Sequence, residues 1–317
     1  MTSTSEQLLR EVPLFEGLDV RGLAELLTPR ELEPGQALWR QGQAADALYV
    51  IASGRVAVTA RLLGEQQSAL AELGPRDVLG ELALLDGGTR TAGVRALELT
   101  RLLSLSLADF RAVVLSRDQG ARELRRRLTG LACSRLGARH RALAATLAGR
   151  PPEVRPALRR PTERPDPAYL LRLPFFRNFR RVELDALLAG ASIEQVQAGD
   201  LLLAEGERSA GLFVTLNGAV EEVIRRNGHT IRLALLGPGR GFGYAGLIAG
   251  GATTAAAAAR ERSVVLVIAP HELEHELEHD PFASAIDRDI VSALRQAERP
   301  QAPLAARGGT PVPSPVR

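Results

Sequence analysis

Residues 32–58 read LEPGQALWRQGQAADALYVIASGRVAV, and residues 196–222 read VQAGDLLLAEGERSAGLFVTLNGAVEE. In both stretches three glycines are separated by seven and then by twelve residues; they are Gly35, Gly42 and Gly54 in the first stretch and Gly199, Gly206 and Gly218 in the second. Further along, VLGELALLDGGTRTAGV aligns without a gap with GFGYAGLIAGGATTAAA, so that Gly80 matches Gly243. Glycines that keep one register over so many positions indicate that a single domain occurs twice in the chain.

Each copy reads as short apolar strands interrupted by glycines. Residues 47–61, ALYVIASGRVAVTAR, alternate apolar with small or polar residues, and Gly54 stands where a hairpin or a bulge favours a residue without Cβ. Segments of helical periodicity flank the copies; they are LLREVPLFEGL, ADFRAVVL, LLRLPFFRNF and HELEHELEH. We therefore expect a mainly β fold class with flanking helices, in which two antiparallel β-barrels of the jelly-roll, cupin-like type are joined by helices and a linker.

The boundaries follow from composition. We expect the first domain over residues 10–115, connecting helices over 116–150, a linker over 151–168, the second domain over 169–298 and a disordered tail over 299–317. The linker PPEVRPALRRPTERPDP contains six prolines in 17 residues, which indicates a stiff and exposed segment. The tail is rich in proline and small residues, so it lacks the apolar side chains that a core requires.

Composition excludes several protein classes. Hydrophobic residues make up 45% and charged residues 24% of the 317 positions, as in ordinary globular proteins. A lone cysteine, Cys133, excludes an intramolecular disulfide and a cysteine-based zinc site. The first residues, MTSTSEQLLREVPLF, do not read as a signal peptide, so a cytoplasmic location is expected. The uncharged run 241–259 is rich in glycine and alanine and belongs to the repeat, so we expect no membrane span.

The sequence GELALLDGGTRTA, residues 80–92, carries the chemistry. A helical turn that opens at Gly80 would direct free backbone N–H groups at an anion. Arg90 could clamp a phosphate, and Glu81 could accept a hydrogen bond from a sugar hydroxyl. One acceptor for a hydroxyl and one arginine for a phosphate match a ribose phosphate ligand.

This motif resembles the phosphate-binding cassette of cyclic nucleotide-binding domains, a family that includes catabolite activator protein and the regulatory subunits of cAMP-dependent protein kinase. The resemblance covers both copies and implies that Glu81 binds the ribose 2′-hydroxyl, that Arg90 pairs with the cyclic phosphate, and that Thr91 contacts the phosphate or a guanine amino group. Backbone amides near Leu82 and Ala83 would assist. The candidate ligand-binding residues are Gly80, Glu81, Leu82, Ala83, Arg90, Thr91 and Ala92. The implied ligand is cAMP or cGMP, with no cofactor and no metal.

The second copy lacks the same chemistry. Tyr244 stands where Glu81 stands, and Thr253 stands where Arg90 stands, so neither the hydroxyl acceptor nor the phosphate counter-charge is present. We therefore expect a degenerate domain that serves as a scaffold or a docking surface.

Two other signals point to different functions. His271, Glu272 and His275 match the HExxH pattern of zinc peptidases, but the repeat places them on the helix after the barrel, where no cleft or third ligand is expected, so we predict no enzyme. All 40 basic residues are arginines, and residues 111–181 hold 18 of them against five acids, which suggests an acidic partner or nucleic acid. Because no segment has room for a helix-turn-helix module, we expect solvated helix faces and interdomain ion pairs instead of specific DNA binding.

The sequence thus predicts a cyclic nucleotide sensor without a catalytic or DNA-binding output domain. The resemblance implies that a helix within residues 109–148 caps the base, with Leu124 or Leu128 as the side chain that faces it. The signal would pass to an unidentified protein partner or to a second copy in a homodimer. The alternatives are a constitutive interaction scaffold with two vestigial cassettes, and a nucleic-acid-associated regulator that acts through the arginine-rich middle.

Overall fold

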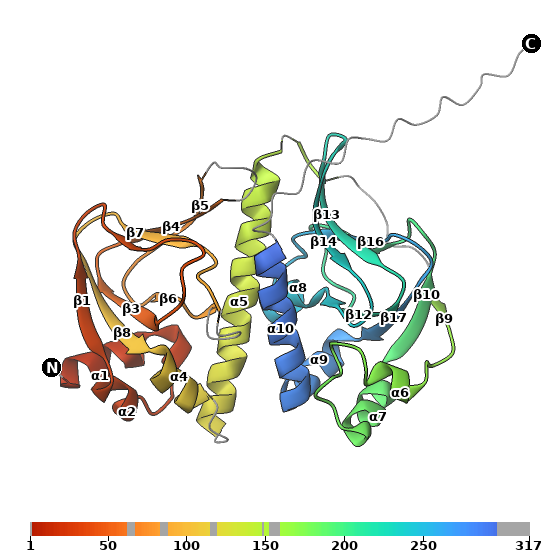
Figure 1. The fold of residues 1–317 in the computed structure, drawn as a ribbon, viewed down its shortest axis with the longest axis horizontal. Helices are drawn as coiled ribbons and strands as arrows, with labels where there is room; N and C mark the ends of the chain where they lie inside the picture. Colours follow the sequence, from red (N-terminus) through yellow and green to blue (C-terminus); the bar gives the residue numbers. More distant parts are fainter. Residues whose placement is uncertain are drawn as a thin grey trace, which may run out of the picture.

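The computed structural model describes residues 2–61, 67–82, 88–114, 119–147, 149–151 and 159–296. Two barrels, one for each sequence copy, lie on either side of one long helix, α5 (Gln119–Ala145) (Figure 1). The predicted tail 299–317, residues 152–158 of the linker and the candidate site residue Ala83 lie outside the described residues.

The first barrel is built from two antiparallel sheets with strand orders β1-β8-β3-β6 and β2-β7-β4-β5. Its strands are β1 (Thr28–Leu32), β2 (Ala37–Trp39), β3 (Ala47–Ser53), β4 (Val56–Arg61), β5 (Gln67–Leu73), β6 (Val78–Leu79), β7 (Gly93–Ala96) and β8 (Thr100–Ser106). Helices cover its lower end; they are α1 (Thr2–Glu11), the 3-10 helix η1 (Pro13–Phe15), α2 (Arg21–Glu25) and α4 (Leu107–Val114) (Figure 1).

The second barrel repeats this design with strand orders β9-β10-β17-β12-β15 and β11-β16-β13-β14. Its strands are β9 (Arg160–Pro161), β10 (Ser192–Val196), β11 (Leu201–Leu203), β12 (Leu212–Asn217), β13 (Val220–Arg226), β14 (His229–Leu236), β15 (Gly241–Phe242), β16 (Ala256–Ala259) and β17 (Ser263–Ile268). Its helices are α6 (Pro167–Leu170), α7 (Arg181–Gly190), α8 (Tyr244–Ile248), α9 (Pro270–Leu277) and α10 (Asp280–Gln296). Apart from β9, each strand has its counterpart in the first barrel, so the predicted tandem of β-barrels is confirmed.

The hairpin considered at Gly54 is wrong, because the strands on its two sides belong to different sheets. β3 pairs with β8 and β6, whereas β4 pairs with β5 and β7. The pairing register of β3 with β8 shifts between Ile51 and Ser53, as it does at a β-bulge. At Gly54 the chain crosses between the sheets with φ +85°, and a Cβ there would lie 2.5 Å from the carbonyl oxygen of Leu99. The glycine is required by this close approach of two backbones.

Two further expectations change in the structure. The segment LLRLPFFRNF was expected to be helical, but beyond α6 it runs as turns, since Pro174 in its middle disfavours a continuous helix. Within the predicted exposed linker, Arg160 and Pro161 form β9, which pairs with Glu194 and Gln195 of β10. This end of the linker is thereby attached to the second barrel.

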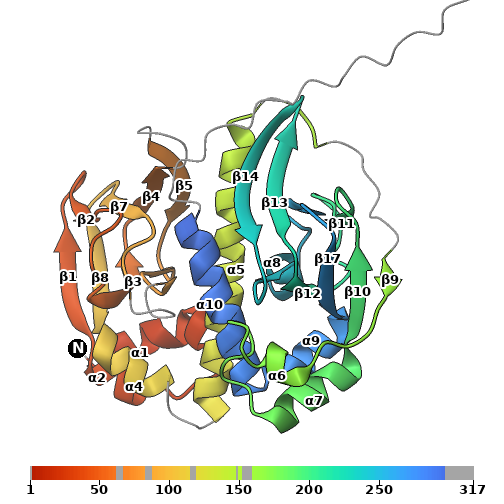
Figure 2. The ribbon, with the colours of Figure 1, turned by 45° about the vertical axis from the view of Figure 1, so that its right-hand side comes forward.

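Helices α5 and α10 lie side by side between the barrels in both views (Figures 1 and 2). Arg125 of α5 forms an ion pair with Asp280 of α10 at 3.1 Å. Further along both helices, the Thr129 hydroxyl donates to Asp287 at 2.7 Å. These two contacts place the N-terminal halves of the helices against each other, so the helices run in the same direction.

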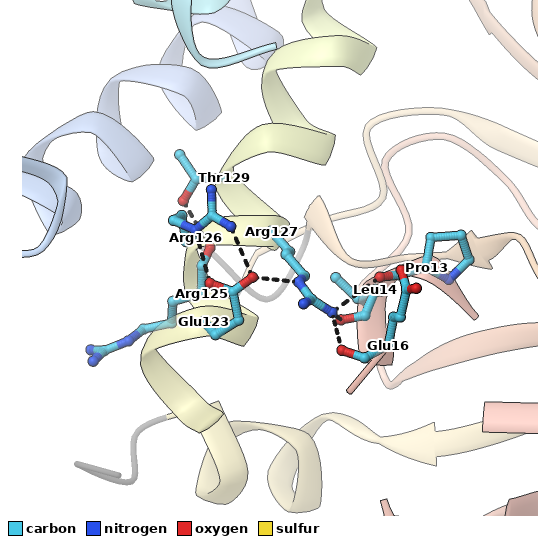
Figure 3. Close-up of polar contacts among 8 residues, drawn as sticks. All are labelled: Pro13, Leu14, Glu16, Glu123, Arg125, Arg126, Arg127 and Thr129. Carbon is cyan, nitrogen blue, oxygen red and sulfur yellow. Dashed lines mark hydrogen bonds and ion pairs between the residues drawn. The ribbon is translucent and has the colours of Figure 1, made fainter. Parts of the chain in front are cut away.

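The start of α5 is also attached to the first barrel. Arg127 donates to the carbonyl oxygen of Glu16 at 2.6 Å and to the carboxylate of Glu123 at 2.6 Å (Figure 3). Arg126 makes two hydrogen bonds to the same carboxylate, and these lower the pKa of Glu123 to about 2. α5 therefore connects the N-terminal segment of the chain to the second barrel.

The leucines of α5 are divided between different cores. Leu124 and Leu128 pack with α1, η1 and α4 of the first domain. Leu136 packs in the core of the second domain, and Leu143 joins a cluster to which both barrels contribute. Among the described helices, none has both the length and the apolar character needed to cross a bilayer.

Candidate functional site

The first barrel contains a cavity of about 520 Å³. The cassette, strands β4 and β5, and one face of α5 form its walls. This volume falls within the range of sites that hold small molecules and cofactors. Of the predicted site residues, Gly80, Glu81, Leu82, Arg90, Thr91 and Ala92 all line this cavity.

Arg90 is 2% exposed and lies in the wall of the cavity. Its Nη2 donates to Asp46 and to the carbonyl oxygen of Ala47, both at 2.7 Å. The guanidinium carbon lies 3.8 Å from the centroid of the Trp39 ring, which makes a cation–π contact. Burial lowers the pKa of Arg90, and Asp46 opposes that change. The result is a buried cation whose carboxylate partner, Asp46, is 72% exposed.

Gly80 allows this position of Arg90. It directly follows β6 with φ +85°, and a Cβ built there would overlap Nη1 of Arg90. The same nitrogen donates to the Gly80 carbonyl oxygen at 3.4 Å. Any other residue at position 80 would displace the guanidinium, so the glycine is a part of the site.

Glu81 is fully buried, and its Oε2 lies 2.9 Å from Nη1 of Arg135 on α5. Within the described part of the chain neither of its carboxylate oxygens accepts a hydrogen bond. Burial raises the pKa of Glu81, whereas Arg135 favours the charged form. Arg135 in turn donates to the carbonyl oxygen of Val78 at 2.5 Å. A buried carboxylate with unused acceptor capacity beside a cavity is suited to accept hydroxyl donors from a ligand.

The remaining predicted residues shape the wall. Thr91 and Ala92 border the cavity, and Trp39 Nε1 donates to the Ala92 carbonyl oxygen at 2.9 Å. Leu82 is buried, and it packs in the same core cluster as Ala132 of α5.

The sequence analysis did not identify the residues that α5 contributes. Leu131, Ser134, Arg135, Ala138 and Arg139 line the cavity from this helix. Leu124 and Leu128, which were expected to face the base, do not line it, because the helix turns them into the core of the first domain. The arginines at positions 135 and 139 have the i, i+4 spacing of side chains on one helix face, and this spacing was the available signal.

At the matching place in the second barrel the cavity is only about 30 Å³, which leaves room for one or two water molecules. Tyr244 is buried there, and the Thr253 hydroxyl donates to the carbonyl oxygens of Ala204 and Glu207. From α5, Leu136 and His140 enter this space, and His140 Nδ1 lies 2.9 Å from Oγ1 of Thr254. The helix fills the volume that is open as a cavity in the first barrel.

Among the residues that the structure describes, neither the histidine pattern nor the arginine-rich segment forms a second ligand site. His275 and His279 are exposed neighbours with 3.4 Å between their Nε2 atoms, and no cluster of three or more metal-ligating side chains occurs among the described residues. Arginines of the basic middle segment make ion pairs within the chain, such as Arg125–Asp280, Arg135–Glu81 and Arg159–Glu194. Cys133 is buried, and this burial raises the pKa of its thiol, which disfavours the reactive thiolate form.

Comparison with known proteins matches residues 29–117 and 193–280 to one family, described as the cyclic nucleotide-binding domain. Over 105 residues the chain is 42% identical to the cyclic AMP receptor protein of Thermus thermophilus, a match that covers 32% of this chain and 49% of that protein. It is 34% identical over 123 residues to a cyclic nucleotide-gated potassium channel of Rhizobium etli, covering 38% of this chain and 33% of the channel.

A third relative is the cAMP-dependent protein kinase regulatory subunit of Dictyostelium discoideum. It is 31% identical over 120 residues, which are 36% of this chain and 37% of that subunit. The chain thus spans half or less of the length of these three relatives.

Proposed function

The chain belongs to the cyclic nucleotide-binding domain family, and from that premise we propose that its first barrel binds one 3′,5′-cyclic mononucleotide and regulates a partner through α5. In this proposal the chain is a regulatory binding protein and not an enzyme. The three relatives named above are a receptor protein, a potassium channel and a regulatory subunit of a kinase. Because these proteins differ in kind, the ligand and the partner of this chain have to follow from the site itself.

The observation that carries the proposal is the position of Glu81 and Arg90 on one cavity. A buried anion with unused acceptor capacity and a buried cation both border the same space of about 520 Å³. A cyclic nucleotide offers hydroxyl donors on its ribose and one negative charge on its phosphate, so its polar groups match these two side chains.

The phosphate would bind at Arg90 by exchange with Asp46. Because Asp46 is 72% exposed, it can return to water at little cost when a ligand anion replaces it. Arg90 would remain stacked on Trp39, which fixes the plane of the guanidinium. The site is therefore prepared for an anion before the ligand arrives.

The ribose hydroxyl would bind at Glu81, whose other partner is Arg135 of α5. A ligand that contacts Glu81 consequently changes the electrostatic environment of α5. Since α5 also packs against α8 and α10, a shift of this helix must reach the second barrel (Figure 2). A ligand with different affinities for two positions of α5 would bias the helix toward one of them.

The second barrel would then serve as the receiver of the signal and not as a second sensor. Its cassette lacks both charged groups, and α5 fills its cavity with Leu136 and His140. The domain limits given above, with a degenerate domain over residues 169–298, belong to this proposal. The protein partner would recognise a surface that changes when α5 moves.

Calorimetric titration of the full chain with cAMP and cGMP, with 5′-AMP as a control, tests the proposal. We expect one of the cyclic nucleotides to bind and to raise the thermal midpoint, since a ligand that binds the native state stabilises it. The Arg90→Ala variant should lose this effect. If neither cyclic nucleotide bound or raised the midpoint, the scaffold with two vestigial cassettes would replace this proposal.

A further inference from the structure

A groove of about 1120 Å³ lies at the start of α5, and the contacts proposed for the nucleotide make no use of it. The first turns of α5 form one part of its lining, and α8, α9 and α10 of the second domain form the rest. The volume exceeds the usual range of sites that hold small molecules. A space of this size suits a segment of a polypeptide better than a small ligand.

The groove lies at the boundary between the two domains. Near it, Leu124 and Leu128 of α5 pack in the core of the first domain, whereas α8, α9 and α10 belong to the second domain. Towards the other end of α5, Leu143 shares a cluster with Ala60 of β4 and Ile224 of β13, so both barrels pack together there. A shift of α5 against the second domain would therefore change the width of the groove.

The apolar part of the lining, which we call the floor of the groove, comes from α8 and α9. α9 contributes Pro270, Leu273 and Leu277, whose i, i+3 and i+7 spacing places them on one face of the helix. α8 adds Leu247 and Ile248. Leu247, Ile248 and Leu277 are only partly buried, and they pack against the core of the second domain beneath them. Apolar side chains on two neighbouring helices form the kind of trough that receives the apolar face of a third helix.

The wall that α5 contributes is basic. Its charged residues are the arginines Arg122, Arg125, Arg126 and Arg127 and one acid, Glu123. Arg126 and Arg127 both donate to Glu123, so this carboxylate is already balanced within the wall (Figure 3). Arg122, Arg125 and Arg126 have the i, i+3 and i+4 spacing of one helix face, and the first and last of them are exposed. The α5 wall thus carries an excess of positive charge.

Two carboxylates border the groove from the second domain. Asp280 pairs with Arg125 at 3.1 Å, and Glu278 is exposed at the junction of α9 and α10. The positive excess therefore lies on α5, and the negative charge lies on the opposite domain. An occupant that complements this arrangement carries acidic residues on its flank toward α5. A second copy docked by twofold symmetry would bring the same hollow surface, which cannot fill a groove.

We propose that this groove docks an amphipathic helix of a partner protein, with aliphatic side chains on the floor and acidic residues toward the α5 wall. The inference rests on the proposed function in one respect, because it takes this helix to be the partner that the nucleotide regulates. A docked helix contacts α5 and the second domain at once, so a shift of α5 changes its affinity. By linkage, the docked helix changes the affinity for the nucleotide by the same factor.

Fluorescence anisotropy with the full chain tests the proposal. The probes are three labelled peptides of about 18 residues, or about five helical turns. They share one stripe of leucines at helical spacing and carry glutamate, glutamine or lysine at the flanking positions. We expect the glutamate peptide to bind, and the lysine peptide to bind about tenfold or more weakly, because like charges would meet on the α5 wall.

Charge reversal tests the wall, and truncation tests the floor. The double variant Arg122→Glu and Arg126→Glu should exchange the order of the glutamate and lysine peptides, a result that loss of folding could not produce. Arg21→Glu with Arg95→Glu is the matched control, because it makes the same change in net charge at exposed arginines outside the groove. Ile248→Ala should weaken the glutamate peptide about fivefold or more, since it removes part of the floor.

The coupling to the nucleotide is measured with the same peptide. Saturating the first barrel with the cyclic nucleotide that binds in the calorimetric titration should change the affinity for the glutamate peptide about fivefold or more. An unchanged affinity would overturn the link between the groove and the sensor.

The outcomes separate the two proposals. No binding of the glutamate peptide, equal binding of the glutamate and lysine peptides, or an order that charge reversal left unchanged would overturn the docking surface and leave nucleotide binding by the first barrel intact. Dimerisation, or binding of double-stranded DNA, that the double variant abolished would overturn it in favour of a second copy or of nucleic acid. Absence of nucleotide binding would overturn the proposed function, while the peptide measurements, made without nucleotide, would still decide the groove.

Discussion

Arg139 and His140 are consecutive residues of α5, yet their side chains enter different barrels. Arg139 lines the cavity of about 520 Å³ in the first barrel, and His140 fills the cavity of about 30 Å³ in the second. Four residues earlier, Arg135 and Leu136 divide in the same way. Successive residues of a helix point about 100° apart, so a single helix between two barrels can close one pocket and occupy the other.

Loss of the phosphate counter-charge gives the first prediction. Arg90→Ala should weaken the cyclic nucleotide by about 2–5 kcal/mol, or about 30- to several-thousand-fold, because the ligand phosphate is left without its partner in a buried site. Isothermal titration calorimetry measures the change. Arg101→Ala removes an exposed arginine that pairs with Glu31 and should have no effect on binding. Equal affinity of Arg90→Ala and the wild type would refute the assignment.

The role of Glu81 can be tested with a double-mutant cycle between protein and ligand. Replacing the ribose by its 2′-deoxy form should cost the wild type about 1.5–3 kcal/mol, the value of a hydrogen bond to a charged group. The Glu81→Ala variant should bind both ligands with equal, reduced affinity, since the acceptor is gone. If the variant still distinguished the two ribose forms, another group would bind the 2′-hydroxyl.

The stoichiometry of binding should be one nucleotide per chain. The second cavity is filled by Leu136, His140 and Tyr244, so restoring the cassette alone should not create a site. We expect the double variant Tyr244→Glu and Thr253→Arg, titrated by calorimetry in the Arg90→Ala background, to remain without strong binding. A second site in the wild type would contradict this expectation.

A pH dependence follows from His140, whose pKa burial lowers to about 4. Because the neutral form is favoured in the folded state, its contribution to stability is present above pH 6.5 and is lost as pH falls toward 4. Asp287 and Asp289, whose pKa values burial raises to about 6, act in the opposite direction. The comparison of wild type with His140→Gln by urea denaturation isolates the histidine, which should account for about 3 kcal/mol of the difference in pH dependence. Parallel pH profiles of the two proteins would contradict a buried neutral His140.

The attachment of α5 to the second barrel should contribute strongly to stability. Leu136 is 3% exposed and packs in the core of the second domain. Leu136→Ala should lower the free energy of unfolding by about 2–5 kcal/mol, as for other buried leucines. Leu235, 51% exposed on β14, provides the control, and Leu235→Ala should change stability by about 0.5 kcal/mol or less. A small effect at Leu136 would indicate that α5 is held elsewhere.

The glycine register determined the tandem fold without knowledge of the structure, because positive φ angles and close backbone approaches leave few other choices at such positions. The sequence pattern around Gly54 did not predict that the strands on its two sides belong to different sheets. Local alternation shows that β3 and β4 are strands, but it carries no information on the partners with which they pair. The separation of these strands into two sheets depends on β8 and β7, which lie far along the chain.

The sequence by itself determined that there are two barrels and that only the first has a charged cassette with Glu81 and Arg90. It could not show that Arg135 and Arg139 belong to the same cavity, or that His140 fills the other one. Those positions depend on the rotation of α5 about its axis. Packing of Leu128 and Leu136 against opposite domains sets that rotation, and such contacts between distant segments exist only in the folded chain.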